Sequence, residues 1–113
     1  MVETTYLKSK SLKKFKSIKY QDIGMNDLIC YSILACKNEE KITVTREEMV
    51  IACFKLFPDK FSLRGHDDLP DSSVVDKRWV DCRDKGFISG KTSMGFDLTS
   101  LGHIKAKEVI KKM

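Results

Sequence analysis

The sequence predicts a single α+β domain that is mainly α with one small β-hairpin. From residue 26 onward, apolar residues recur at helical spacing in four segments, each bounded by residues that start or stop helices. Two short apolar runs flank the polar stretch Lys91–Met94, which is the pattern of two antiparallel strands and their turn. The chain has 113 residues, 42% of them hydrophobic, which is enough for one core and too few for two.

The first helix is predicted from about Asn26 to Lys37, because Asn26 is a favourable N-cap residue. Its inward face holds Leu28, Ile29, Ser32, Ile33 and Cys36. The polar residues 37–41 end this helix, and the alternating residues 42–44 predict a short strand.

The second helix is predicted to follow a capping box. The Thr45 hydroxyl can accept the amide hydrogen of Glu48, while the Glu48 carboxylate bonds back to the start of the helix. Pro58 stops this helix after about Phe57. Its apolar stripe consists of Met49, Ala52, Cys53 and Leu56.

Residues 59–70 are predicted to form a loop, in which Phe61 and Leu63 contact the core. The third helix is predicted to begin near Ser72, because Pro70 and Asp71 provide favourable start residues. Its buried stripe at positions i, i+4 and i+7 consists of Val75, Trp79 and Cys82. Gly86 is expected to close this helix in a left-handed conformation.

The hairpin is predicted over residues 87–90 and 95–98. Thr99 then caps a last helix that continues through Lys112. The inward stripe of that helix consists of His103, Ala106, Val109, Ile110 and Met113.

The positive charge is concentrated at the N-terminus. Residues 1–24 contain six lysines against Glu3 and Asp22, a net charge of +4, whereas residues 25–113 contain 15 basic and 14 acidic residues, a net charge of +1. We therefore divide the chain into a basic N-terminal arm, residues 1–24, and a folded domain, residues 25–113. Such an arm is typical of contact with nucleic acid or an anionic surface, and equally of a solvated segment.

The arm and the last helix both carry apolar residues that lack an obvious place in one small core. In the arm, Leu12, Phe15 and Ile18 have near-helical spacing, which predicts a short amphipathic helix between residues 10 and 20. In the last helix the corresponding residues are Ala106, Val109, Ile110 and Met113. Pairing these stripes across a two-fold axis would bury them, so we expect a homodimer through the arm and the C-terminal helix.

Enzymatic and metal chemistry find no support in the sequence. No phosphate-binding loop, G-x-S-x-G motif or dinucleotide fingerprint is present, so we expect no catalytic activity and no cofactor. The four cysteines have no metal-ligand spacing, and we expect buried, reduced thiols and no bound metal. His66, Asp67 and Asp68 are consecutive, which favours a turn over a metal site. With no secretory start and no apolar run of about 20 residues, the protein is expected to be cytoplasmic.

Two motifs carry a family resemblance. Residues 73–88, which end in Lys85-Gly86-Phe87-Ile88, resemble the recognition helix of the winged helix-turn-helix superfamily and its exit into the wing. Residues 98–102, Leu-Thr-Ser-Leu-Gly, resemble the L-T-x-x-G that leads from the wing into the final helix. The resemblance covers residues 25–113 and is greatest to small regulators of the multiple-antibiotic-resistance type. It implies a three-helix core, a wing and a C-terminal helix.

The resemblance also implies sequence-dependent binding of double-stranded DNA by a transcriptional regulator. The third helix would enter the major groove, and the hairpin would contact an adjacent groove or phosphate. The candidate contacts are Ser72, Ser73, Val74, Asp76, Lys77 and Arg78 on the helix, Lys91, Thr92 and Ser93 in the wing, and Lys13, Lys14 and Lys16 in the arm. For each of these residues, the alternative interpretation is an ordinary solvated surface position with no DNA contact.

The alternative is a winged-helix protein–protein interaction module, a non-catalytic subunit of a larger assembly. The segment before the third helix is longer than the turn of a simple helix-turn-helix. It also carries Asp67, Asp68 and Asp71, which would repel phosphates. The nearly neutral body and these acidic residues favour a protein partner.

Overall fold

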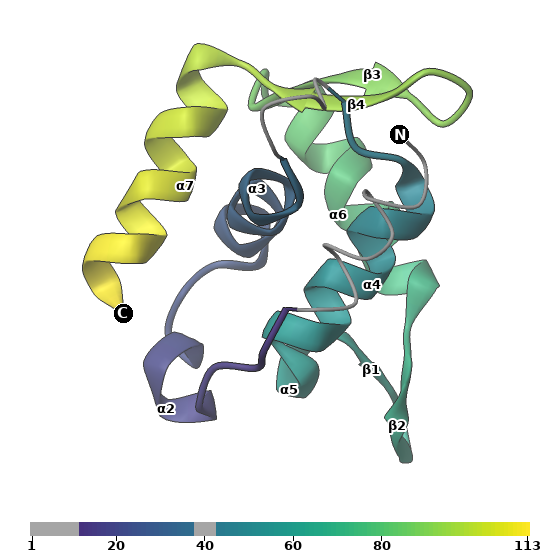
Figure 1. Cartoon of the computed structure of the whole chain (residues 1–113), viewed down its shortest axis with the longest axis vertical. Coiled ribbons are helices and arrows are strands. Elements are labelled where there is room, and N and C mark those ends of the chain that lie inside the picture. Colours follow the sequence, from purple (N-terminus) through teal and green to yellow (C-terminus); the bar gives the residue numbers. More distant parts are fainter. Residues whose placement is uncertain (1–11, 38–42) are drawn as a thin grey trace.

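Three helices form the centre of the structure: α3 (Met25–Cys36), α4 (Arg46–Leu56) and α6 (Ser72–Asp84). The computed structural model describes residues 12–37 and 43–113. A fourth long helix, α7 (Ser100–Lys112), lies along α3, and the single-turn helices α2 (Ser17–Tyr20) and α5 (Pro58–Phe61) lie at the opposite end from the last hairpin (Figure 1). The result is a mostly helical α+β fold, as the sequence predicts.

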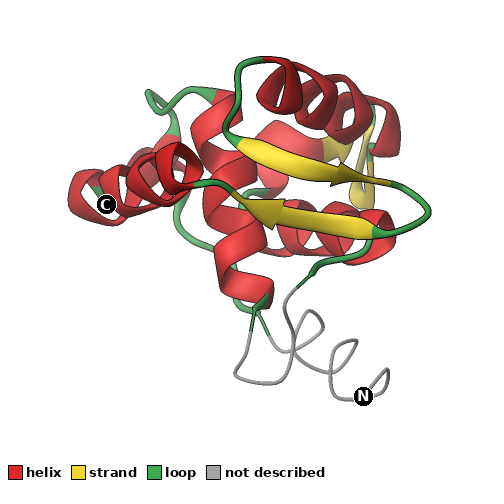
Figure 2. Cartoon of the chain, turned by 90° about the horizontal axis from the view of Figure 1, so that it is seen from above, coloured by secondary structure: helices red, strands yellow, loops and turns green. Residues whose placement is uncertain are grey.

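Two antiparallel hairpins extend from the helices toward opposite ends of the domain (Figure 1). The first consists of β1 (Ser62–Leu63) and β2 (His66–Pro70), and the second of β3 (Ile88–Lys91) and β4 (Gly95–Leu98). Seen from above in Figure 2, the β3–β4 hairpin lies across one end of the helical body. Of the strand predicted over residues 42–44, the structure has a single bridge from Val44 to Phe96 in β4; Thr43 is not part of a strand, and residue 42 lies outside the described ranges.

The predicted inward stripes of α3, α4 and α6 are confirmed, whereas that of α7 is confirmed only in part, because Ala106 and Val109 are buried but Ile110 is 53% exposed. All five residues predicted for α3, all four for α4 and all three for α6 are buried. Trp79 is 8% exposed, and its ring centre lies 4.7 Å from that of Phe96, so α6 and the β3–β4 hairpin share one core. The packing of aromatic and aliphatic side chains between these elements is the main stabilising contribution.

The predicted capping residues also stand where the sequence places them. Thr45 and Glu48 form the full capping box of α4, Asp71 caps α6, and Thr99 caps α7. Gly86 has a φ of +80° just after α6, the left-handed conformation that glycine adopts without strain.

The start of α3 and the segment before α6 differ from the prediction. Asn26 is not the N-cap: α3 begins at Met25 after Gly24, and the Asn26 side chain instead donates to Asp81 Oδ2 on α6 at 2.6 Å. The predicted loop over residues 59–70 is wrong, because it contains α5 and the β1–β2 hairpin. Phe61 is buried as expected, whereas Leu63 is exposed on β1.

From residue 12 onward, the predicted N-terminal arm is part of the packed domain. Tyr20 and Ile23 are 1% and 6% exposed, and Phe15 stacks on Phe57 with ring centres 5.7 Å apart. The predicted amphipathic helix is limited to the single turn α2, because the Phe15 amide donates to the Leu56 carbonyl at the end of α4 and holds residues 12–16 in a non-helical path. Residues 1–11 lie outside the described ranges.

The same packing removes the reason for expecting a homodimer. Leu12, Phe15 and Met113 pack against the core and Ala106 and Val109 are buried within it, while Ile18 and Ile110 remain exposed. Most of the apolar residues assigned to a two-fold interface therefore have partners within one chain. The homodimer itself stays a prediction.

Candidate nucleic-acid interface

Helix α6 has one anchored side and one open side. Val75, Trp79 and Cys82 fix it to the core, while Ser73, Lys77 and Arg78 are exposed. Neither Lys77 nor Arg78 forms an ion pair with another residue among 12–37 and 43–113. These three predicted contact residues are thus free to meet an external partner.

Ser72 and Val74 are placed differently from their neighbours on α6. Ser72 occupies the first turn and is half-buried, and Val74 packs partly against the core while its amide donates to the capping carboxylate of Asp71. A thymine-methyl contact by Val74 would therefore use only the exposed part of that side chain. The N-terminal turn of α6 is held by its own cap.

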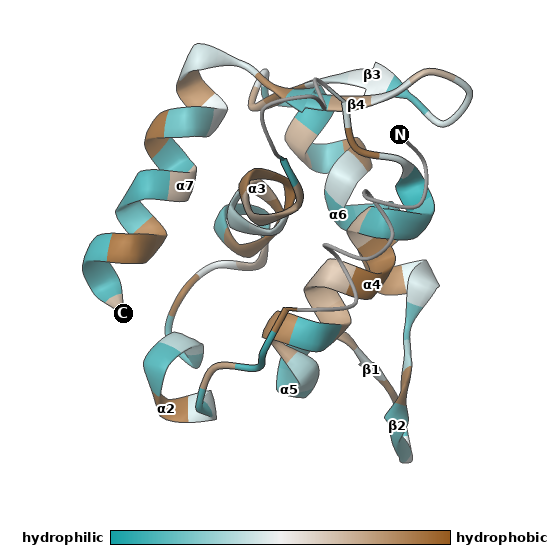
Figure 3. Ribbon diagram, in the orientation of Figure 1, coloured by the Kyte–Doolittle hydropathy of each residue, from teal (hydrophilic) through white to brown (hydrophobic). Residues whose placement is uncertain are grey.

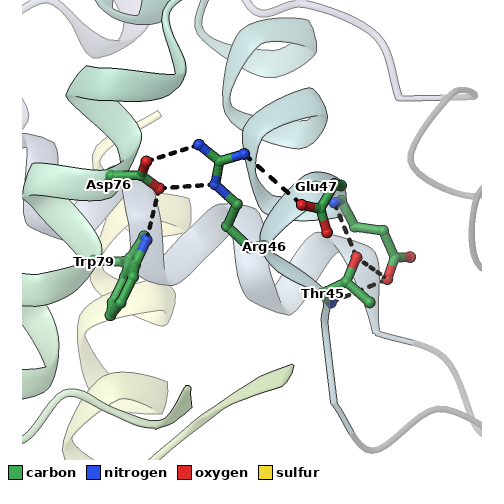
Figure 4. A network of polar contacts seen from close by, with 6 residues as sticks. Thr45, Arg46, Glu47, Asp76 and Trp79 are labelled. Carbon is green, nitrogen blue, oxygen red and sulfur yellow. Dashed lines mark hydrogen bonds and ion pairs between the residues drawn. The ribbon is translucent and has the colours of Figure 1, made fainter. Parts of the chain in front are cut away.

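Asp76 is occupied by an intramolecular network rather than open to DNA (Figure 4). Arg46 at the start of α4 donates to both carboxylate oxygens, from Nε to Oδ1 at 2.9 Å and from Nη2 to Oδ2 at 2.7 Å. The indole Nε1 of Trp79 donates to Oδ1 at 2.9 Å. The assignment of Asp76 as a DNA contact is therefore corrected: its carboxylate clamps α6 to α4, in the two-pronged geometry that favours arginine.

We expect the clamp to show in the pH dependence of stability. Hydrogen bonding from Arg46, and then from Trp79, holds the pKa of Asp76 below its ordinary value of 3.8. Its contribution is therefore complete above the unfolded-state pKa and is lost as the pH falls through the lower folded-state pKa. Asp76→Asn should lower the free energy of unfolding at pH 7 by about 1 kcal/mol, allowing for solvent screening of this partly exposed pair.

Urea denaturation from pH 7 down to pH 3 checks this prediction. The difference in the free energy of unfolding between wild type and Asp76→Asn should shrink as the pH falls below about 4, because protonation of Asp76 removes the same charge from the wild type. Asp84→Asn is the matched control, since Asp84 is exposed on the same helix and forms no ion pair among the described residues. A difference for Asp76→Asn that does not change with pH would contradict this role of the carboxylate.

The tip of the β3–β4 hairpin is open to solvent beside α6. Lys91, Thr92 and Ser93 are exposed, as is Met94 at 70%. Arg83 connects the two elements, because its guanidinium lies 5.0 Å from the centre of the Trp79 ring and donates to the Gly90 carbonyl at 3.3 Å. The predicted wing contacts thus lie on a hairpin whose base is fixed to α6.

The predicted arm contacts lie elsewhere. Lys13, Lys14 and Lys16 are exposed, yet Phe15 between them bonds to Leu56 at the C-terminal end of α4. The Arg46–Asp76 clamp lies at the N-terminal end of α4, about 15 Å away along an 11-residue helix that rises about 1.5 Å per residue. The structure therefore brings α6 and the hairpin together but leaves these lysines apart from them.

Sequence reasoning missed Arg46 and the lysines of α7. Nothing in the sequence marks Arg46, because its partner Asp76 is 30 residues away. The lysines of α7 did carry a signal: residues 100–113 contain Lys105, Lys107, Lys111 and Lys112 against Glu108, a net charge of +3. A charge count for each predicted element would have found them.

The cysteines offer no reactive or metal-binding group in the described part of the chain. All four are buried without a disulfide, and burial raises the pKa of the Cys53 thiol to about 12. The pKa of Cys82 is also raised, chiefly by a hydrogen bond with Cys30. Both thiols are therefore protonated at neutral pH and poor nucleophiles. Within residues 12–37 and 43–113, no three His, Cys, Asp or Glu side chains are arranged to hold a metal ion.

None of the helices in the described ranges has the length and apolar character needed to cross a membrane. No protein-family model, curated protein or solved structure matches the chain.

Proposed function

We propose that this domain binds double-stranded DNA in the winged-helix manner, with α6 reading the bases and the β3–β4 hairpin acting as the wing. The order of elements supports the proposal, because α3, the Val44 bridge, α4, α6, the β3–β4 hairpin and α7 occur in the sequence order of the superfamily that the chain resembles, with α5 and the β1–β2 hairpin inserted between α4 and α6. A transcriptional regulator is the role that fits sequence-dependent binding of this kind.

The observation that carries the proposal is the open side of α6. Lys77 and Arg78 project from a helix whose opposite side is locked, and the neighbouring negative charge of Asp76 is neutralised by Arg46. Lysine and arginine donate to guanine O6 and N7 in the major groove, and a serine such as Ser73 donates to phosphate. A helix held rigidly at its base presents these donors in a fixed register, which is what base reading requires.

A selection experiment tests the proposal. Duplexes that bind are enriched from a random pool, and affinities for the enriched and random sequences are then compared for wild type and for Lys77→Ala/Arg78→Ala. The double variant should lose about 1–3 kcal/mol per base contact on the enriched sequence and much less on random DNA, so that its sequence preference disappears.

The matched control is Lys55→Ala/Lys60→Ala, which removes the same charge from the α4–α5 end. This control should keep the preference of the wild type. If no sequence is enriched, or if Lys77→Ala/Arg78→Ala discriminates as well as wild type, α6 does not read bases.

A protein partner is the second candidate, and the β1–β2 hairpin is the observation in its favour. Leu63 and Leu69 are 39% and 46% exposed there, next to the exposed carboxylates of Asp67 and Asp68. An apolar and acidic projection suits a protein surface better than phosphate. Retention on heparin discriminates the two functions. A truncated chain used in that experiment has to keep residue 12 and all later residues, because side chains between residues 12 and 24 pack in the core.

A further inference from the structure

The proposed reading elements carry no excess positive charge. In α6, Lys77, Arg78 and Arg83 are balanced by Asp76, Asp81 and Asp84, and in the β3–β4 hairpin Lys91 is balanced by Asp97. The affinity of proteins for duplex DNA depends strongly on lysines and arginines that replace counterions at phosphates. If α6 reads the bases, another surface has to hold the backbone.

Two other segments carry more than the whole net charge of the chain. Residues 12–24 contain four lysines and one aspartate, and residues 100–113 contain four lysines and one glutamate, so each has a net charge of +3. Their sum of +6 exceeds the +5 of the complete protein. The fold brings the two segments together, because Lys19 Nζ lies 3.5 Å from the Met113 carbonyl oxygen at the end of α7.

The lysines of α7 begin beside the reading elements and lie in two pairs around the helix: at 100° per residue, Lys107 and Lys111 are about 40° apart and Lys105 and Lys112 about 20° apart, with roughly 130° between the two pairs. Lys105 Nζ lies 5.4 Å from the centre of the Phe87 ring, and Phe87 connects α6 to β3. From Lys105, α7 continues for about 12 Å, at 1.5 Å per residue, to its contact with Lys19 at Met113. We name this set of lysines the lysine track; it consists of Lys105, Lys107, Lys111 and Lys112 on α7 and Lys13, Lys14, Lys16 and Lys19 around α2.

We propose that the lysine track binds the phosphate backbone of the same duplex, on the stretch next to the bases that α6 reads. This inference rests on the proposed function and adds that contacts with the bases and contacts with the phosphate backbone are made by two different surfaces. All eight cations are lysines, which act as point charges, whereas arginine forms planar two-pronged contacts. The track is therefore expected to bind without sequence preference and to require a duplex that extends beyond α6 and the wing.

The distribution of apolar residues favours a duplex over a lipid surface. Leu101, Ile104 and Ile110 are exposed on α7, but at 100° per residue Leu101 and Ile110 lie about 180° apart around the helix, and Ile104 lies about 60° and 120° from them. They cannot enter a bilayer together, and Figure 3 shows hydrophilic and hydrophobic residues alternating along α7. A second copy of this helix would meet like charges, which disfavours self-association through it.

The experiment compares random duplexes of about 12 and about 24 base pairs over a series of salt concentrations. Lys107→Gln/Lys111→Gln removes two exposed lysines one turn apart, and Lys13→Gln/Lys16→Gln removes two at the other end of the track. Each double variant should flatten the plot of log affinity against log salt by about 1.8 on the long duplex, at about 0.9 per lost phosphate contact, and by much less on the short one.

Lys60→Gln/Arg64→Gln is the charge-matched control, because these two residues belong to α5 and the β1–β2 hairpin and not to the track, and it should behave as wild type at both lengths. Circular dichroism confirms that each variant is folded. If both track variants keep the wild-type salt dependence while Lys77→Ala/Arg78→Ala loses sequence preference, the track inference is wrong and the proposed function stands. If wild type binds no duplex, both fail. Track-dependent binding to vesicles of phosphatidylserine and phosphatidylcholine, without dependence on duplex length, would overturn the inference in favour of a lipid surface.

Discussion

Removal of residues 1–24 is expected to abolish cooperative unfolding, whereas removal of residues 1–11 is expected to preserve it. The longer truncation deletes Tyr20, Ile23 and Phe15, which fill one end of the core. The Tyr20 ring centre lies 4.9 Å from that of Phe57, and the Tyr20 hydroxyl accepts a hydrogen bond from the Asp59 amide at the start of α5. Deleting one buried aromatic side chain costs about 3–5 kcal/mol, and a small domain has about 5–15 kcal/mol in total.

Thermal unfolding followed by circular dichroism measures this difference. The shorter truncation removes none of the described contacts, so it is the control for shortening the chain. Tyr20→Ala in the full chain should show an intermediate loss, about 3–5 kcal/mol at the denaturation midpoint. A cooperative transition that survives the loss of all 24 residues would show that this segment is dispensable for folding.

Gly102→Ala is expected to destabilise the protein by roughly 1–3 kcal/mol, although alanine normally stabilises a helix relative to glycine. A Cβ atom at position 102 would lie 1.9 Å from the Phe87 carbonyl oxygen and 3.0 Å from its carbonyl carbon. That carbonyl cannot easily move, because it accepts from both the amide of Thr99 at 3.1 Å and its hydroxyl at 3.0 Å. The close approach of α7 to the turn after α6 therefore requires glycine.

Gly24→Ala is the matched control for this substitution. Gly24 has an ordinary φ of −62°, and a Cβ atom there would meet nothing within 4 Å. Because Gly24 is the N-cap of α3 and alanine is a poorer N-cap, its replacement should cost less than about 1 kcal/mol. Equal midpoints for the two variants in chemical denaturation would show that the backbone around Phe87 adapts without cost.

The parts of the fold that the sequence predicted are those determined by near neighbours in the chain. A capping box spans four residues, and a buried stripe repeats every three or four, so Thr45, Thr99 and the Val75–Trp79–Cys82 stripe could be recognised directly. Gly102 is an intermediate case. The sequence motif that contains it could be recognised, but the reason for a glycine there, the close approach of the Phe87 carbonyl, could not.

The parts that escaped prediction depend on contacts between distant residues. Residues 12–16 are held by α4 about 40 positions later, and a run of lysines around Phe15 looks the same whether it is packed or solvated. The β2 strand contains Asp67 and Asp68 and is exposed for most of its length, so it lacks the apolar alternation that identifies strands. In the candidate interface, Asp76 is chemically a plausible surface group, and only the position of Arg46 shows that its carboxylate is used internally.

The location of Trp79 gives the protein a built-in optical reporter. It is the only tryptophan in the chain, and its indole contacts Asp76 of the clamp, Phe96 of the hairpin and the guanidinium of Arg83. Each of these contacts affects the surroundings that determine indole emission. Fluorescence excited at the tryptophan band therefore reports on the junction between α6 and the hairpin without any added label, and a shift on mixing with a ligand would indicate that this junction has changed.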